Sequence, residues 1–341
     1  MTWAESNLDS LRSGFDLFLQ QTVLSICPPD MPLLWEMVAY HFGWDKPHLN
    51  PSKRLRPQFV LLSAALFGGD LQLAMLPAVA IEVLHNYTLI HDDIEDSGES
   101  RHGRSSLWQV YGPAQALNTG DFLASSTHTI LSRLEGQVSP DVLRKVRYHF
   151  ERAGLGVTLG QHLDILSEKL PTISLVEYER LIELKTARLF EASFGMGAVI
   201  AGATAAQEDA LVRLGWNFGL GFQVLDDYLG IWAAPNQTGK STFTDLISRK
   251  KSFPILYGQE KGGRFTELWS TLGVITEEDA KSLAELLSAD GAEEVTREKA
   301  LAYATSAQKE LNALDGKPDY QAALGQLIRQ VFAPLRISNS N

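Results

Sequence analysis

Apolar residues recur at intervals of three and four positions along most of this chain. This spacing places apolar side chains on one face of a helix, and no long alternating runs of β-branched residues compete with it. The pattern predicts an all-α chain of about ten helices with little or no sheet. The clearest runs are Leu8, Leu11, Phe15, Phe18, Leu19; Leu76, Val79, Ala80, Val83, Leu84; Leu181, Leu184, Leu189, Phe190; and Val212, Phe218, Phe222, Leu225, Leu229.

Proline and glycine fall where such helices are expected to begin or end. Examples are Gly68-Gly69, Gly112-Pro113, Pro140, Pro171 and Gly230. No Pro/Gly/Ser-rich linker divides the sequence, so residues 1–341 are predicted to form one domain. The chain is too long for a minimal four-helix bundle, which favours a larger helical bundle with a central cavity.

Composition and charge narrow the class of protein. The 341 residues include 30 Lys+Arg and 41 Asp+Glu, for a net charge of −11, which argues against a nucleic-acid partner. A lone cysteine, Cys27, makes no intrachain disulfide, and the N-terminus lacks the pattern of a secretion signal. No uncharged apolar stretch reaches the ~18 to 20 residues of a bilayer span, so we expect no transmembrane segment. The low cysteine content favours a cytoplasmic protein.

Two acidic pairs carry the candidate chemistry. Asp92 and Asp96 lie one helical turn apart with Asp93 beside them, and Asp226-Asp227 ends a second apolar helix. The first motif alone is equally compatible with a solvated helix end. Two such pairs, each at a helix end whose dipole disfavours negative charge, are better explained as opposed carboxylate clusters that bind divalent cations, with Mg²⁺ favoured if a phosphate completes its shell.

Basic residues occur in compact groups elsewhere in the chain. Arginine suits phosphate oxygens as a bidentate fork and lysine as a compact charge. Carboxylates for metals and separate cations for oxyanions predict a polyphosphate substrate, and the absence of a Gly-x-x-x-x-Gly-Lys-Ser/Thr loop argues against a nucleoside triphosphate. The groups are Lys53-Arg54-Leu55-Arg56, Arg101-His102-Gly103-Arg104, Lys185-Thr186-Ala187-Arg188, Lys240 and Arg249-Lys250-Lys251.

These motifs, in this order from about Lys53 to Tyr257, resemble the trans-isoprenyl diphosphate synthases, also called polyprenyl synthetases. The resemblance implies the isoprenoid synthase fold. It implies that Lys53, Arg56 and His85 bind the diphosphate of isopentenyl diphosphate. Arg101 matches the arginine that contacts the allylic diphosphate, whereas His102 replaces a second arginine, a loss for which Arg104 is the candidate compensation.

The same resemblance covers the acidic pairs. Asp92, Asp93 and Asp96 match the family's first aspartate-rich motif in its short form. Gln223, Asp226 and Asp227 match the second, whose third aspartate is replaced here by Gly230. The resemblance implies about three Mg²⁺ ions, for which Asp92, Asp96, Asp226 and Asp227 are the candidate ligands. Further matches are Lys185, Thr186, Lys240 and Lys250, which are expected to bind the allylic diphosphate.

The implied reaction joins isopentenyl diphosphate to an allylic diphosphate by ionisation, condensation and loss of a proton. Tyr87 and Thr88, five and four residues before Asp92, are expected to limit chain length. An aromatic residue at the first of these positions predicts geranylgeranyl diphosphate, with farnesyl diphosphate second, although ordinary helix packing explains Tyr87 equally simply. A non-catalytic regulatory subunit of a prenyl synthase and a terpene cyclase are the alternative functions, and a homodimer is the expected assembly.

Overall fold

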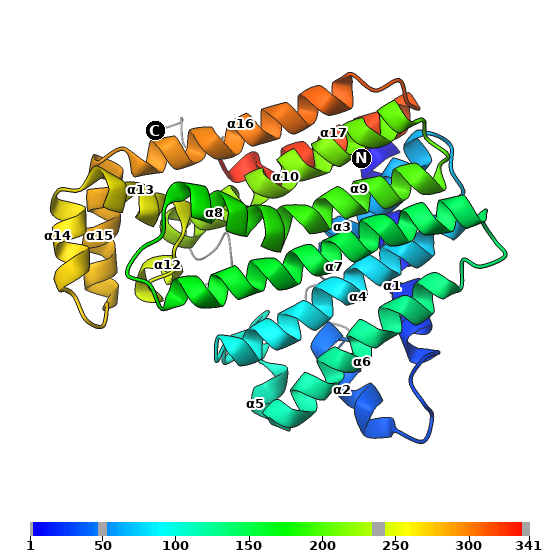
Figure 1. Cartoon of the computed structure of the whole chain (residues 1–341), viewed down its shortest axis with the longest axis horizontal. Helices are drawn as coiled ribbons and strands as arrows, with labels where there is room; N and C mark the ends of the chain where they lie inside the picture. The colour runs from blue at the N-terminus through cyan, green and yellow to red at the C-terminus, as the bar shows by residue number, and fades with distance from the viewer. Residues whose placement is uncertain (1–2, 47–52, 234–242, 336–341) are drawn as a thin grey trace. The chain divides into compact units, whose positions relative to one another are not determined.

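The computed structural model describes residues 3–46, 53–233 and 243–335, and these are almost entirely helical (Figure 1). The all-α prediction is therefore confirmed. The small exception is a two-stranded antiparallel hairpin, β1 (Ser100–Arg101) and β2 (Arg104–Ser105). The helices are α1 (Trp3–Leu24), α2 (Pro32–Phe42), α3 (Leu55–Leu66), α4 (Leu71–Glu95), α5 (Leu107–Tyr111), α6 (Pro113–Ser132), α7 (Pro140–Glu168), α8 (Leu175–Ile182), the π-helix η1 (Glu183–Ala187), α9 (Arg188–Ile200), α10 (Ala205–Trp232), α12 (Thr244–Ile247), α13 (Phe253–Lys261), α14 (Arg264–Thr271), α15 (Glu277–Ala289), α16 (Ala292–Asn312) and α17 (Pro318–Val331).

The helices form two compact units, each assembled from segments that are far apart in the sequence. Unit 1 takes its described residues from 1–154, 189–212 and 313–326. Unit 2 takes its described residues from 155–188, 213–312 and 327–341. The expected single domain spanning 1–341 stays a prediction.

Unit 1 is built around α4, which packs against α3 and α6 (Figure 1). Phe59 of α3 is fully buried and stacks on Phe194 of α9, with 4.5 Å between the ring centroids. Gly197 allows α9 to approach this closely, because a Cβ atom there would lie 2.3 Å from the carbonyl oxygen of Val60. The acidic end of α4 is thus carried by a helix that is packed on several sides.

Unit 2 has its own apolar core, formed where the end of α10 meets α12 to α16. Ile231 of α10 and Leu246 of α12 are fully buried in it, together with Phe265, Leu283 and Leu287. Burial of side chains from all these elements fixes α12 against α10. Helix α10 carries the second acidic motif, and α12 carries Asp245.

Helix ends follow the sequence signals in most places. Asp70 caps α4 by accepting a hydrogen bond from the Gln72 N–H at 2.8 Å, and Ser174 with Glu177 forms a capping box at α8. Pro113 occupies the first turn of α6. The prediction of a helix end at Gly230 was wrong, because α10 continues to Trp232.

Helix α4 is long and strongly apolar. Among the described residues it is the one helix long and apolar enough to span a bilayer, and 67% of its most apolar stretch is buried inside the structure. Core helices of globular proteins have the same composition.

Candidate active site

The first acidic motif lies at the C-terminal end of α4 in unit 1, and its carboxylates differ in their surroundings. Asp93 is 5% exposed and accepts two hydrogen bonds from Arg101, one from Nε at 2.8 Å and one from Nη2 at 2.7 Å. Burial raises the pKa of Asp93, an effect that Arg101 opposes. Asp92 is partly exposed, with its Oδ2 atom 3.7 Å from Nη2 of Arg101, and Asp96 is exposed.

The hairpin of β1 and β2 presents Arg101 to this motif. Its two loop residues, His102 and Gly103, both have positive φ, at 52° and 75°, as two-residue hairpin turns of type I′ require. His102 is exposed at this turn. Arg104 pairs with Asp45 through two hydrogen bonds of 2.8 and 2.7 Å, so the cation expected to compensate for His102 is engaged elsewhere.

The residues expected to bind isopentenyl diphosphate come from the segment just before α3, the first turn of α3 and the middle of α4. Lys53 is exposed. The Arg56 guanidinium lies 4.6 Å from the Phe190 ring centroid, and its buried Nε atom has no hydrogen-bond partner among the described residues. Burial lowers the pKa of Arg56 to about 10. His85 is kept neutral, because burial and the nearby Arg56 and Arg101 lower its pKa well below the ordinary value.

Arg54, although it stands between the two predicted cations, has a structural role. Its guanidinium is 7% exposed and binds Asp16 at 2.9 Å and the buried Glu82 at 2.6 Å. A buried arginine needs such partners, since an unpaired charge in the interior is strongly unfavourable. This pairing explains why only Lys53 and Arg56 of the group remain candidates for phosphate.

The two chain-length candidates lie one to two turns before the first motif. Tyr87 and Thr88 are half-buried, and the Thr88 hydroxyl donates to the His85 carbonyl at 2.7 Å. The Tyr87 ring makes an edge contact with the ring of His91, with centroids 5.7 Å apart. His91 in turn packs on Gly120 of α6, where a Cβ atom would lie 2.3 Å from its Nε2.

The second acidic motif, on α10 in unit 2, has the same division into a buried and an exposed carboxylate. Asp227 is 1% exposed, and its Oδ2 accepts hydrogen bonds from the Tyr178 hydroxyl at 2.6 Å and the Phe253 N–H at 2.9 Å. Its Oδ1 accepts a bond of 3.1 Å from Gln223, whose amide oxygen accepts one of 2.7 Å from the Thr186 hydroxyl. Burial raises the pKa of Asp227.

Asp226 presents the exposed carboxylate of this pair, with 46% of its side chain accessible. Lys250 holds its ammonium group 3.8 Å from Asp226, 3.6 Å from Asp227 and 3.8 Å from Asp245. The Lys250 ammonium group therefore lies close to three carboxylates. One of them, Asp245, belongs to neither aspartate-rich motif.

Lys185 lies in η1, a single π-helical turn between α8 and α9. Such turns are often found at functional sites. Its ammonium group is 2.5 Å from the carboxylate of Asp164 on α7. Gly160 allows the backbones of α7 and η1 to lie close together, since a Cβ atom there would lie 2.4 Å from the backbone nitrogen of Lys185. Lys240 lies outside the described residues.

The periodic pattern contained a signal for the two buried aspartates. Asp93 continues the buried stripe of Asn86 and Ile90 on α4. Asp227 continues the stripe of Leu220 and Val224 on α10. A carboxylate in a buried apolar stripe needs hydrogen-bond donors. The position of each aspartate around its helix therefore predicts that Asp93 and Asp227 are buried, whereas Asp92 and Asp226 are accessible.

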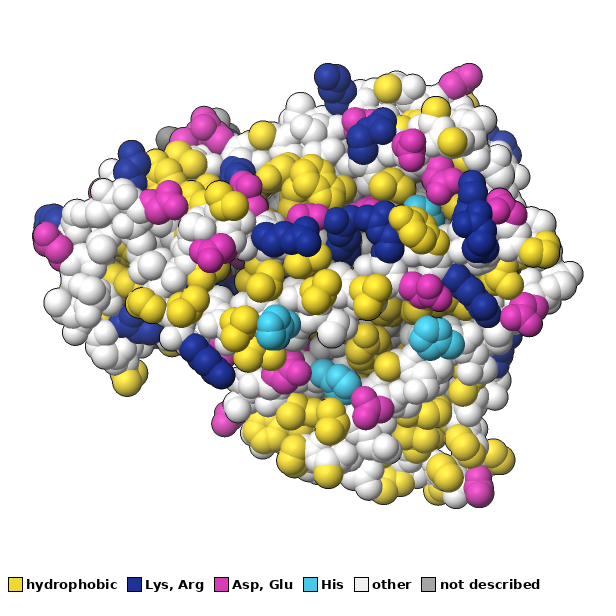
Figure 2. Space-filling model, viewed as in Figure 1, with side chains coloured by type: hydrophobic (Ala, Val, Ile, Leu, Met, Phe, Trp, Pro, Cys, Tyr) yellow, Lys and Arg dark blue, Asp and Glu magenta, His cyan; other side chains and the backbone are white. Residues whose placement is uncertain are grey.

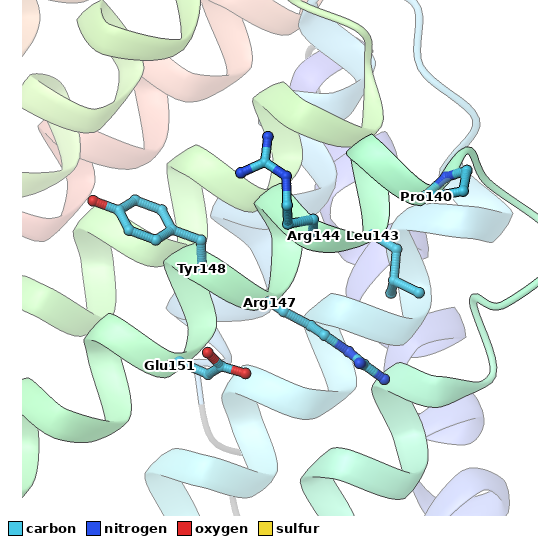
Figure 3. A pocket seen from close by; sticks show the side chains of 6 residues that line it. All are labelled: Pro140, Leu143, Arg144, Arg147, Tyr148 and Glu151. Carbon is cyan, nitrogen blue, oxygen red and sulfur yellow. The ribbon is translucent and has the colours of Figure 1, made fainter.

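The surface of α7 has a hollow of about 400 Å³ that contains no motif residue (Figure 3). Its lining comes from the first three turns of that helix, and two of its arginines are paired, Arg144 with Asp141 and Arg147 with Glu135. On the face shown in Figure 2, Lys and Arg side chains are interspersed with acidic and apolar ones. We therefore assign the chemistry to the two acidic motifs.

The donor set of these motifs fits Mg²⁺. Among the described residues, no three Asp, Glu, His or Cys side chains converge on one point to form a complete metal cage. Mg²⁺ in phosphate-handling sites takes one or two carboxylates and completes its shell with water and phosphate oxygens. The accessible carboxylates of Asp92, Asp96 and Asp226 suit such partial coordination.

Comparisons with a family model, with related sequences and with solved structures all indicate the same protein family. The Polyprenyl synthetase family model matches residues 45–289. The chain is 38% identical to (2E,6E)-farnesyl diphosphate synthase of Mycobacterium tuberculosis over 237 residues, which are 68% of this chain and 65% of that protein. It is 33% identical to geranylgeranyl diphosphate synthase of the same organism over 330 residues, 94% of this chain and 92% of that protein. The solved geranylgeranyl pyrophosphate synthetase of Pyrococcus horikoshii superposes with a TM-score of 0.88 at 29% identity, covering 96% of this chain and 98% of the other.

Proposed function

The chain belongs to the polyprenyl synthetase family, and on this premise we propose that it is a trans-prenyltransferase that joins isopentenyl diphosphate to an allylic diphosphate, with geranylgeranyl diphosphate as its main product. The observation that carries the proposal is the pairing within each acidic motif. In both motifs the second aspartate is buried and held by donors, while the first is accessible. This arrangement fixes an accessible carboxylate in place for a metal-bound diphosphate.

Asp92, Asp96 and Asp226 are the proposed Mg²⁺ ligands, and Asp93 and Asp227 orient their surroundings. Bound Mg²⁺ supplies charge neutralisation for the departing diphosphate. Asp227, also a candidate ligand from the sequence, already accepts bonds from Tyr178, Phe253 and Gln223. A carboxylate with this many donors is better suited to positioning than to coordination.

The cations bind and orient the two diphosphates. Arg101 uses Nε and Nη2 for Asp93, so its Nη1 donors are directed to the allylic diphosphate. Lys185 and Lys250, each beside carboxylates of unit 2, add compact positive charge to the same group, as does Lys240. Arg56 offers its buried Nε to isopentenyl diphosphate beside the neutral His85, and Lys53 provides an exposed charge.

Carbon–oxygen cleavage gives an allylic cation, which the double bond of isopentenyl diphosphate attacks. Preorganised charges stabilise the departing diphosphate more than the ground state, which is how they accelerate the step. The proton that is lost passes to the released diphosphate, so the reaction needs no side-chain base. Exclusion of water protects the cation from hydrolysis.

Product length is tested with purified protein, isopentenyl diphosphate and each allylic primer, with Mg²⁺ or with a chelator. We expect a twenty-carbon product that requires the metal. Tyr87→Ala should lengthen the product because it removes the aromatic ring before the first motif, while Tyr87→Phe, which keeps the ring, should not. An unchanged distribution in Tyr87→Ala would show that another residue limits the chain, and a fifteen-carbon product from the parent protein would establish farnesyl diphosphate instead.

We also propose a homodimer, on the strength of an apolar stripe along α7. Leu155, Leu159 and Leu166 are 66%, 52% and 46% exposed and lie on one face of the helix. Such leucines along a long helix are typical of a surface that another chain covers. Sedimentation equilibrium checks this, and a solution mass equal to one chain would refute it.

A further inference from the structure

Glu82 is a buried carboxylate of α4 that belongs to neither aspartate-rich motif and to none of the groups expected to bind phosphate. Its side chain is 3% exposed, and its neighbours Ile81 and Val83 are fully buried apolar residues. A carboxylate in such surroundings is unfavourable unless it is paired and hydrogen-bonded. Its partners therefore indicate why an acidic residue is found at this position.

Two side chains donate hydrogen bonds to Glu82. Arg54, in the segment before α3, donates from Nη1 to Glu82 Oε1 at 2.6 Å, and Asn86, one turn further along α4, donates from Nδ2 to the same atom at 3.2 Å. The Arg54 guanidinium also donates from Nε to Asp16 of α1 at 2.9 Å. The Oδ1 atom of Asn86 lies 3.2 Å from Nε2 of His41 on α2. Glu82 is thus the centre of a chain of polar contacts that joins α1, α2 and α4 to the segment before α3.

The backbone at Arg54 depends on such an anchor. Its φ and ψ are 47° and 43°, in the left-handed region that is unfavourable for a residue with a Cβ atom, and it is the last residue before α3 begins. Its side chain is 7% exposed and is held by the carboxylates of Glu82 and Asp16. These two contacts fix the direction in which the chain enters α3.

Lys53 and Arg56, the two candidate cations for isopentenyl diphosphate, lie on either side of this turn. The Gln58 side chain donates from Nε2 to the Lys53 carbonyl at 2.6 Å, and the Gln58 N–H donates to the Arg54 carbonyl at 3.1 Å. Arg56 lies in the first turn of α3, so its direction follows from where the helix begins. A change of conformation at Arg54 would therefore move both cations relative to α4.

Glu82 also acts on this site by its charge. Burial lowers the pKa of Arg56 to about 10, and the negative charge of Glu82 opposes that effect. Charge interactions are stronger in such poorly solvated surroundings than in water. His85, the third candidate for binding isopentenyl diphosphate, comes three residues after Glu82 and so lies on the same face of α4. The carboxylate of Glu82 is thus well placed to influence the whole group.

We propose that Glu82 is a positioning residue for the isopentenyl diphosphate site, where it anchors Arg54 and so orients Lys53 and Arg56. The inference rests on the proposed function in that Lys53, Arg56 and His85 are taken as the groups that bind this substrate. It adds that the buried carboxylate serves one of the two substrates: its loss should impair binding of isopentenyl diphosphate and leave binding of the allylic diphosphate unchanged.

The test compares removal of one partner with replacement of both. Glu82→Gln keeps the shape of the side chain but removes its charge. Arg54→Met/Glu82→Leu replaces both partners by apolar side chains of similar size, which avoids an unpaired charge in the interior. Asp16→Asn weakens the other anchor of Arg54 at a side chain that is 28% exposed, where a lost charge is well tolerated.

Glu208→Gln is the matched control, because it removes a largely buried carboxylate elsewhere in unit 1. Glu208 pairs with His149 at 2.8 Å and with Lys145 at 3.3 Å, and neither partner belongs to the candidate site. Each protein is assayed for kcat and for the KM of each substrate. Its Tm and its Kd for isopentenyl diphosphate, the latter by calorimetry, are measured without turnover.

For Glu82→Gln we expect the KM and the Kd of isopentenyl diphosphate to rise about tenfold or more, while the KM of the allylic diphosphate changes less than about twofold. Asp16→Asn should give a smaller change of the same kind. The double variant Arg54→Met/Glu82→Leu should regain most of the Tm lost in Glu82→Gln but none of the affinity for isopentenyl diphosphate, because stability requires only that no charge is left unpaired, whereas orientation requires the anchor. Glu208→Gln should lower Tm and leave both KM values unchanged.

The inference is overturned if Glu82→Gln raises both KM values alike or neither of them. It is also overturned if the double variant regains affinity for isopentenyl diphosphate together with Tm, since Glu82 would then serve stability alone. If Glu82→Gln does not fold, Asp16→Asn and the double variant supply the same comparison. Failure of the proposed function looks different, because the parent protein itself then forms no prenyl product and binds no isopentenyl diphosphate.

Discussion

Replacement of Arg249 tests how the backbone before Lys250 is held. Arg249 has a φ of 53°, in the left-handed region that favours glycine. Its guanidinium donates to the carbonyl oxygens of Trp269 at 3.2 Å, Gly273 at 3.3 Å and Leu272, and it lies 4.6 Å from the Trp269 ring centroid. These carbonyls are at the C-terminal end of α14, where a helix has unpaired acceptors and favours positive charge.

The structure predicts an unusual order of stabilities at this position. Loss of hydrogen bonds from a charged donor costs about 2 to 3 kcal/mol in either Arg249→Ala or Arg249→Gly. Alanine retains the left-handed strain of about 1 kcal/mol, whereas glycine relieves it. We therefore expect stability to fall in the order arginine, glycine, alanine, the reverse of the usual preference for alanine over glycine.

Thermal unfolding measures this order. An unfolding entropy of roughly 2.1 cal/mol/K per residue means that 1 kcal/mol shifts the Tm of a 341-residue chain by about 1.4 °C. Arg249→Gly should thus melt about 1 to 2 °C above Arg249→Ala. The matched control is Lys281 in the middle of α15, where Ala should exceed Gly by a similar amount. If Ala exceeds Gly at position 249 as well, strain at this residue is not relieved by glycine and the reasoning is refuted.

Two further predictions concern unit 1. Burial lowers the pKa of His41 to about 3 and that of His85 well below 6.5, so these two histidines take up protons in the unfolded chain first. Their contribution to the free energy of unfolding should be constant above pH 7 and should fall below about pH 6.5 by up to ~2.7 kcal/mol per pH unit. His41→Gln should halve that slope in denaturant titrations, and an unchanged slope would contradict the assignment. Gly120→Ala should displace His91 and so raise the Mg²⁺ concentration that gives half-maximal activity several-fold. Adding His91→Ala to that variant should restore the parent value. Gly154→Ala is the control and should have no effect, because the nearest atom to a Cβ there would be 3.6 Å away.

The sequence was sufficient for the helices and for the positions of the motifs, because both are local properties. Periodicity predicts that Asp92 and Asp93 point in different directions, since neighbouring helical residues are about 100° apart. It does not reveal which donors a buried aspartate finds. Arg101 reaches Asp93 only because His102 and Gly103 reverse the chain, and the sequence suggested a missing arginine there rather than a turn.

Longer-range relations were beyond the sequence for the same reason. Tyr178 lies 49 residues before Asp227 in the chain, and the spacing between them carries no periodic signal. Gly230 illustrates the limit most clearly. As a sequence feature it predicts a helix end and a lost metal ligand. The structure shows instead an uninterrupted helix, with the carboxylate of Asp245 in the space beside Gly230.

The donors of the buried aspartates also explain how the two acidic motifs persist before any substrate binds. A buried carboxylate without a partner would be strongly destabilising, and the dipole at the end of α4 adds to that cost. Arg101 offsets it for Asp93, and Lys250 offsets it for Asp227. Because each cation is held by the buried member of its pair, it remains close to the accessible one, where a metal-bound diphosphate would arrive. In the proposed reaction, the cations that stabilise the fold would therefore already be oriented, and binding would not need to order them.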